Sequence, residues 1–326
     1  MKGFGYSFAA ALVLFSLCGS VRAEKPIRIV ASTGHYAAIA KIVGGDRVEV
    51  RSLLKDGQGP RGVEPKPSLL VPLNQTDLLV ESGRDLELGW LTDLLTRSTN
   101  RAILPEAVGH VDASEGVDLI FYKGNQVDLP LLASFFGPRG EELTSIANPY
   151  YHLDPASGEA IARNIYQKLI AIDPDHAADY RARLGSFRNR LSEKMKEWDA
   201  RMAPYRGRSV AADRHSWDYL ARRHGFSIVG YIEPRVATVS TSVVRPPDSS
   251  QAAALAGEMK ALGIGLLLQE ENDTDRVVGE TATRAGARRI VLPAMIEKEN
   301  PSPDDYFAFY NRLYGKLASA LQEKGN

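Results

Sequence analysis

Beyond residue 24 the chain alternates between short apolar runs and longer amphipathic stretches. The runs are rich in Val, Ile and Leu, which favours strands, and the stretches between them carry apolar residues at helical spacing. This alternation of strand and helix predicts parallel sheets that are covered by helices on both faces. The predicted strands are 27–31, 48–54, 78–80, 102–104, 210–212, 227–231, 264–268 and 289–292.

The strongest helical periodicity lies in the middle of the chain. Asp173-Pro174 is typical of a helix start, because proline fits the first helical position. Apolar residues then recur every three or four positions, at Ala177, Tyr180, Leu184, Phe187, Leu191, Met195, Trp198 and Met202. At roughly 30 residues this helix would be about 45 Å long, which is more than one small domain requires.

These patterns together predict an α/β fold with two lobes, each a mainly parallel sheet flanked by helices, joined by one long rigid helix. We expect the N-terminal lobe to span 24–172, the linking helix 173–204 and the C-terminal lobe 205–326. The stretch 112–145 is irregular and is predicted to be a long loop.

The first 23 residues have the layout of a secretory signal peptide. An early cation is followed by an apolar run over 8–17, and the segment ends in Val21-Arg22-Ala23, which suits a cleavage site. The apolar run is too short for a permanent membrane span. Cys18 could carry a lipid, but Leu17 before it is bulky where lipoprotein processing requires a small residue. We therefore expect a periplasmic protein that is released after Ala23 rather than tethered at Cys18.

Composition excludes several classes of protein. The 326 residues include 40 Lys and Arg against 40 Asp and Glu, so nothing favours a nucleic acid partner. Cys18 is the single cysteine, which excludes an internal disulfide and cysteine-based metal centres. The sequence has no glycine-rich phosphate loop and no nucleophile elbow, and it indicates no organic cofactor. Glu270 and Glu271 could serve as acid and base near His215, but adjacent side chains rarely face one target, so we expect no enzyme.

Six sequence blocks occur in a characteristic order: 44–50 (GGDRVEV), 59–68 (GPRGVEPKPS), 83–91 (GRDLELGWL), 148–155 (NPYYHLDP), 214–220 (RHSWDYL) and 233–234 (EP). In this order they resemble the blocks of the zinc/manganese-type (cluster A-I) solute-binding proteins of ABC uptake systems. The resemblance covers nearly the whole chain after the signal. It implies two α/β lobes bridged by a helix, with a transported zinc or manganese ion held between them. It also implies delivery to the membrane permease of an ABC transporter, and we expect a monomer.

The chain departs from that family at the positions of the metal ligands. The three metal-binding histidines of the family are replaced by Arg61, Tyr150 and Arg214. The position of an acidic fourth ligand is occupied by Pro293 or Ala294. Arginine keeps its proton at any accessible pH and therefore cannot bind a cation. Two guanidinium groups would also repel a divalent metal, so we expect a cationic pocket.

Three interpretations follow for the ligand site. Metal could be bound by displaced ligands, because imidazole and carboxylate suit zinc. The candidate displaced ligands are His35, His152, His215 and Glu270. Alternatively, Arg61, Arg214 and the hydroxyl of Tyr150 could bind a small anionic ligand or a metal chelate. The third interpretation is an interaction protein without a transport role on the same fold.

Overall fold

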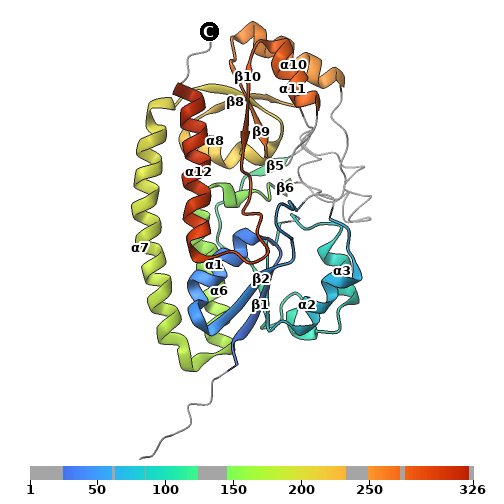
Figure 1. The fold of residues 1–326 in the computed structure, drawn as a ribbon, viewed down its shortest axis with the longest axis vertical. Helices are drawn as coiled ribbons and strands as arrows, with labels where there is room; N and C mark the ends of the chain where they lie inside the picture. Colours follow the sequence, from blue (N-terminus) through green and yellow to red (C-terminus); the bar gives the residue numbers. More distant parts are fainter. Residues whose placement is uncertain are drawn as a thin grey trace, which may run out of the picture.

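The computed structural model has two α/β lobes stacked along the long axis of the molecule (Figure 1). It describes residues 25–60, 63–84, 86–123, 145–232, 249–271 and 276–322. In the first lobe, four parallel strands lie in the order β2-β1-β3-β4. They are β1 (Ile27–Ala31), β2 (Val48–Ser52), β3 (Leu78–Glu81) and β4 (His110–Asp112).

Helices cover both faces of this sheet. They are α1 (Gly34–Gly44), α2 (Leu70–Gln75), α3 (Leu91–Arg97) and α6 (Ser157–Ile172). Successive residues of a strand point to opposite faces. Accordingly, Ile29 and Ala31 of β1 join the core that includes α1 and α6, whereas Val30 packs with Leu73 of α2 and Leu94 of α3.

The second lobe repeats this architecture, with four parallel strands in the order β10-β9-β7-β8. The strands are β7 (Ser209–Ala212), β8 (Ser227–Tyr231), β9 (Leu266–Glu270) and β10 (Arg288–Leu292). Its helices are α8 (Asp218–His224), α10 (Ser249–Leu262), α11 (Arg276–Ala285) and α12 (Pro303–Gln322). A small antiparallel pair, β5 (Phe121–Lys123) and β6 (Ser145–Ala147), lies between the lobes (Figure 1).

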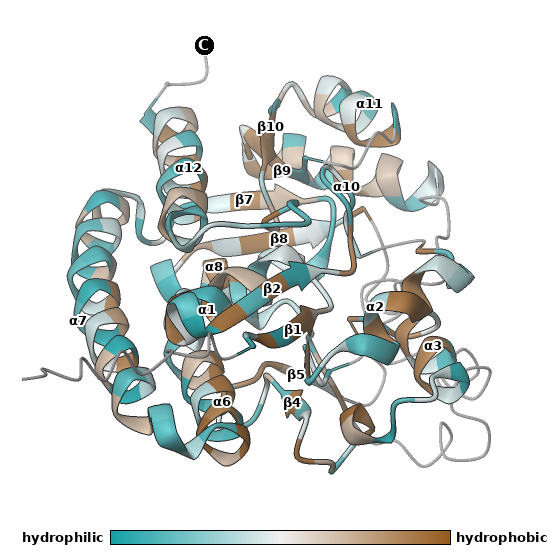
Figure 2. Cartoon of the chain, turned by 60° about the horizontal axis from the view of Figure 1, so that its bottom comes forward, coloured by the Kyte–Doolittle hydropathy of each residue, from teal (hydrophilic) through white to brown (hydrophobic). Residues whose placement is uncertain are grey.

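The linking helix α7 (Ala177–Met202) has 26 residues and runs along one side of both lobes (Figure 1). Single 3-10 turns at Pro174–His176 and Ala203–Tyr205 adjoin its two ends. Its buried residues are Tyr180, Leu184, Phe187, Leu191, Trp198 and Met202, and Figure 2 shows the rest of its surface as mainly hydrophilic. These residues belong to one hydrophobic core that also contains residues of both sheets, so the lobes and the linking helix share their packing.

The predicted fold class is confirmed, and most predicted elements lie within two residues of the observed ones. One strand prediction is wrong: 102–104 lies in a 3-10 turn at Arg101–Ile103, and the fourth strand of the sheet is β4. The amide of Asn100 explains the turn, because its oxygen accepts a hydrogen bond from the main-chain nitrogen of Ala102 at 3.2 Å. Helix α2 was not predicted, since Pro72 interrupts its pattern.

Several predictions fall outside the described residues. These include the signal segment 1–23 with Cys18, Arg61, most of the predicted loop 112–145, and the block 233–234. The domain boundaries at 24, 173 and 205 stay a prediction. Within the described part of the chain, no helix is both long and apolar enough to span a bilayer.

Candidate ligand-binding cleft

The carboxyl ends of strands from both sheets border the region between the lobes (Figure 1). The segment after β10 returns to the first lobe. There the main-chain nitrogen of Ser52, at the end of β2, donates a hydrogen bond to the carbonyl oxygen of Glu299 at 2.7 Å. Ligands of open parallel sheets bind outside the carboxyl ends of the strands. The candidate site residues therefore come from the segments that follow β1, β7, β9 and β10, and from the 3-10 turn η5 (Tyr151–Leu153).

Tyr150 and His152 are buried at this turn, with ring centroids 5.9 Å apart. The side-chain oxygen of Asn148 accepts a hydrogen bond from the nitrogen of Tyr150 at 2.9 Å and so orients the turn. His152 Nε2 donates to the carbonyl oxygen of Ala294 at 2.9 Å, which leaves the lone pair of the neutral ring on Nδ1. Among the described residues, that Nδ1 has no hydrogen-bond partner.

Burial lowers the pKa of His152 to about 4, against the opposing effects of the Ala294 carbonyl and of the negative charge on Glu270. The imidazole is therefore neutral at physiological pH, which is the form that binds metal. Glu270 ends β9, in the second lobe. Two of the predicted displaced ligands, one from each lobe, thus interact electrostatically.

Arg214 follows β7 and is only 8% exposed. Its Nε lies 4.0 Å from Asp213 Oδ2 and 4.0 Å from Glu270 Oε2. Asp213 is itself held by two donors, the indole nitrogen of Trp217 at 2.9 Å and the main-chain nitrogen of Glu270 at 2.8 Å. The positive charge of Arg214 is thus compensated by two carboxylates, whereas Arg61, the other cation of the expected pocket, lies outside the described residues.

The carboxyl of Asp213 has a raised pKa of about 7. Burial is the main cause, the neighbouring charge of Glu270 adds to it, and Arg214 opposes both. Sequence reasoning did not identify Asp213 as a site residue. The available signal was its position, directly before Arg214, for which the sequence resemblance predicts the place of a family histidine.

The other two predicted ligands lie in different surroundings. His35 is in the core, where its ring packs against His152 at 5.0 Å and Phe309 at 5.2 Å between centroids, and burial keeps its pKa well below the usual value. His215 Nδ1 lies 3.2 Å from Asp218 Oδ2, and its ring stacks on Tyr231 at 3.5 Å. His35 therefore backs His152, whereas His215 belongs to a separate polar cluster around Asp218.

The cluster around Asp218 connects strand β5 to helix α8. Asp218 accepts hydrogen bonds from the hydroxyls of Tyr122 at 2.5 Å and Tyr231 at 2.6 Å. Asn148 joins the same network, because its amide donates to the Tyr122 hydroxyl and to the carbonyl oxygen of His215. Within the described ranges, no group of three or more His, Cys, Asp or Glu side chains is arranged to hold a metal ion.

A buried carboxylate supports the first-lobe side of the cleft. Glu87 accepts hydrogen bonds from the Ser32 hydroxyl at 2.5 Å and from the hydroxyl and the nitrogen of Ser82 at 2.6 and 3.0 Å. Burial raises the pKa of Glu87 to about 7, with a further contribution from the charge of Glu81. Glu87 thereby fixes the loops that follow β1 and β3.

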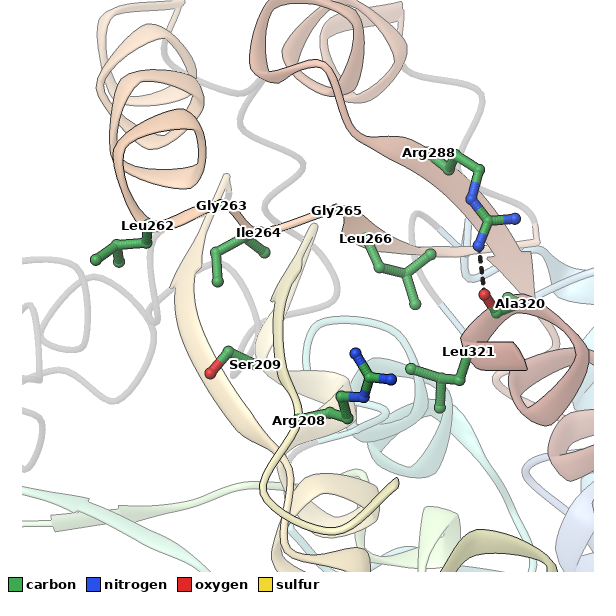
Figure 3. A pocket seen from close by; sticks show the side chains of 10 residues that line it. All are labelled: Arg208, Ser209, Leu262, Gly263, Ile264, Gly265, Leu266, Arg288, Ala320 and Leu321. Atoms are coloured by element: carbon green, nitrogen blue, oxygen red, sulfur yellow. Dashed lines mark hydrogen bonds between the residues drawn. The ribbon is translucent and has the colours of Figure 1, made fainter. Parts of the chain in front are cut away.

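A pocket of about 500 Å³ lies at the amino ends of the second-lobe strands. Figure 3 shows Leu266 between Arg208 and Arg288, and Arg288 donates to the carbonyl oxygen of Ala320. Ligand sites of such sheets lie at the opposite edge, so this pocket is not at the expected ligand position.

Several solved structures share this two-lobed fold. The Pseudomonas aeruginosa solute-binding protein FpvC in complex with Mn²⁺ superimposes with a TM-score of 0.75 at 20% identity, covering 91% of this chain and 99% of that one. A crystal structure of ZnuA gives a TM-score of 0.70 at 20% identity, covering 91% of this chain and all of that one. These likenesses establish the fold.

Curated relatives extend the comparison. The manganese ABC transporter substrate-binding lipoprotein PsaA of Streptococcus anginosus is 23% identical over 99% of this chain and the whole of that protein. The metal ABC transporter substrate-binding lipoprotein SsaB of Streptococcus sanguinis is 28% identical over 90% of this chain and 89% of that protein. Both relatives are named as lipoproteins.

The family described as "ZnuA: Zinc-uptake complex component A periplasmic" matches residues 29–320. This match confirms the resemblance seen in the sequence blocks, and it confirms the expectation of a solute-binding protein rather than an enzyme. The chain belongs to the ZnuA family of periplasmic metal-uptake components.

Proposed function

We propose that this protein is the extracytoplasmic receptor of an ABC uptake system and that its cargo is a divalent metal of the zinc/manganese class. The observation that carries this proposal is the family match over nearly the whole chain. The paired lobes support it, since the carboxyl ends of both sheets border one region. On this proposal the receptor delivers its cargo to a membrane permease.

We further propose that His152 and Glu270 contact the cargo from opposite lobes. Neutral imidazole and carboxylate are suitable zinc ligands, and the lone pair on His152 Nδ1 is available in the described structure. Tyr150 lies beside His152 and would line the same space. His215 is left out of this set because its ring is engaged with Asp218 and Tyr231.

An anionic ligand or a metal chelate is the less favoured cargo. That interpretation needs positive charge directed at the ligand, and Arg214 is instead close to Asp213 and Glu270. Arg61, the other cation on which the interpretation rests, lies outside the described residues. The relatives also carry metal in their names, which favours a bare cation over a chelate.

Isothermal titration calorimetry with Zn²⁺ and Mn²⁺ on the purified exported protein tests the cargo. Stoichiometric binding of either ion that is weakened by Glu270→Gln and by His152→Gln would support the proposal. The matched control is Glu271→Gln, because Glu271 points to Arg312 and Lys316 of α12 instead. If neither ion binds while a carboxylate or phosphate stabilises the fold, the metal cargo is wrong.

The N-terminus can be processed in two ways, and the measured mass of the intact protein distinguishes them. The names of the relatives favour a lipid on Cys18, whereas the bulky Leu17 favours cleavage after Ala23. A lipid-modified chain that begins at Cys18, lost in Cys18→Ala, would establish tethering. A chain that begins at Glu24 would establish release. Sedimentation of the same sample tests the expected monomer.

A further inference from the structure

We propose that Arg214 is a specificity-determining residue of this cleft: its guanidinium takes the place of a bound cation beside Asp213 and Glu270 and thereby weakens the binding of free divalent metal. This inference rests on the proposed function and concerns the same site. The relevant charges at the carboxyl edge of the second sheet are those of Asp213, Glu270 and Arg214.

Two carboxylates meet there because their strands are neighbours. Asp213 follows β7, Glu270 ends β9, and these strands pair in parallel. The main-chain nitrogen of Glu270 donates to Asp213 Oδ2, which fixes the two residues relative to one another. Asp213 is 1% exposed and Glu270 is 9% exposed, so both carboxylates are largely withdrawn from water.

Buried carboxylates require a compensating positive charge or a proton. Arg214 meets that requirement, with its Nε 4.0 Å from an oxygen of each carboxylate. A divalent ion would meet the same requirement. The ion and the guanidinium cannot both do so without repelling one another at short range in a partly dehydrated site. Metal can therefore use Glu270 only by displacing Arg214 or by tolerating its charge.

The position of Arg214 distinguishes this role from that of an ordinary structural ion pair. The residue follows β7 at the carboxyl edge, whereas structural pairs such as Arg28 with Asp77 lie at the amino edge of the first sheet. Glu270, its partner, ends β9 at the same carboxyl edge of the second sheet. Substitution of Arg214 should consequently change metal affinity as well as stability.

Titration of the full exported protein with Zn²⁺ and with Mn²⁺ tests the inference. We expect Arg214→Gln to tighten binding of at least one ion by about tenfold or more relative to the unmodified protein. Adding Glu270→Gln to that variant should abolish the gain. The matched control is Arg208→Gln, which removes an exposed cation from the opposite end of β7, at the pocket in Figure 3. It should leave the affinity unchanged.

The outcomes separate this inference from the proposed cargo. If the unmodified protein binds metal and Arg214→Gln binds no tighter, the inference is overturned and the cargo stands. If only Arg214→Gln binds metal, the inference stands and metal is not the cargo of the native chain. If neither binds, both fail. Should Arg214→Gln not fold, Arg214→Met replaces it, because Met removes the charge and keeps an unbranched side chain for packing; an unchanged metal affinity in that variant would overturn the inference.

Discussion

His152 Nε2 donates a hydrogen bond to the carbonyl oxygen of Ala294 at 2.9 Å. This bond joins the 3-10 turn η5 to the segment that follows β10. The main chain of the same residue is held from α12, because the Tyr310 hydroxyl donates to the carbonyl oxygen of His152 at 2.5 Å. His152 is fully buried. One residue therefore connects three parts of the molecule between the lobes.

His152→Ala should lower the free energy of unfolding by about 3 kcal/mol, since it removes a buried ring and the bond to Ala294. Urea denaturation followed by far-UV circular dichroism measures this change. The control His176→Ala, at a partly exposed position before α7, should cost much less. A loss below about 1 kcal/mol for His152→Ala would contradict the described role.

Gly34→Ala should loosen the contact between the lobes. A Cβ at Gly34 would lie 2.4 Å from the carbonyl oxygen of Ile296 and 2.7 Å from that of Lys298, and main-chain atoms cannot rotate away. Hydrogen exchange should become faster in the segment after β10. Gly185→Ala in α7 is the control, because a Cβ at that position would point into open space. It should stabilise the protein by up to about 1 kcal/mol.

Glu87→Gln should alter how stability depends on pH. In the folded protein the pKa of Glu87 is raised to about 7, so the folded state retains a proton that the unfolded chain loses above the ordinary value of 4.5. The contribution of Glu87 to stability is therefore full below pH 4.5 and is lost as the pH rises through 7.

The stability of the unmodified protein relative to Glu87→Gln should accordingly fall between these two pH values. Denaturation of both proteins across this range measures the difference. Glu193→Gln, on the exposed face of α7, serves as the control and should leave the pH profile unchanged. A constant difference between the unmodified protein and Glu87→Gln would argue against the raised pKa.

Arg223→Met should weaken the attachment of α8 to the linking helix α7 and to the first lobe. The guanidinium of Arg223 in α8 pairs with Asp154 of the first lobe at 3.0 Å and with Asp199 of α7 at 2.7 Å. Removing it leaves the partly buried Asp154 without this partner, so we expect a loss of about 1–3 kcal/mol in thermal or urea unfolding. The exposed pair Arg276–Glu280 is the comparison, and Arg276→Met should cost no more than about 0.5 kcal/mol.

The sequence by itself determined the secondary structure and the family. Strands β1 and β8 have the bounds that the apolar runs predicted, because a local pattern of side chains is sufficient to specify which backbone face is buried. The same local reasoning went wrong at 102–104, where the side chain of Asn100 stabilises a turn that hydrophobicity does not reveal.

Only the tertiary structure decided the chemistry of the cleft. From the resemblance, Arg61 and Arg214 were predicted to stand at histidine positions of the family, and the expectation of a cationic pocket rested on those two charges. The compensating Glu270 lies 57 residues beyond Asp213 and reaches it because β7 and β9 are neighbours in the sheet. Likewise, the separation of His215 from His152 depends on which aromatic rings surround each imidazole. Strand order and side-chain packing are long-range properties, so the charge at the site emerges only when the chain is folded.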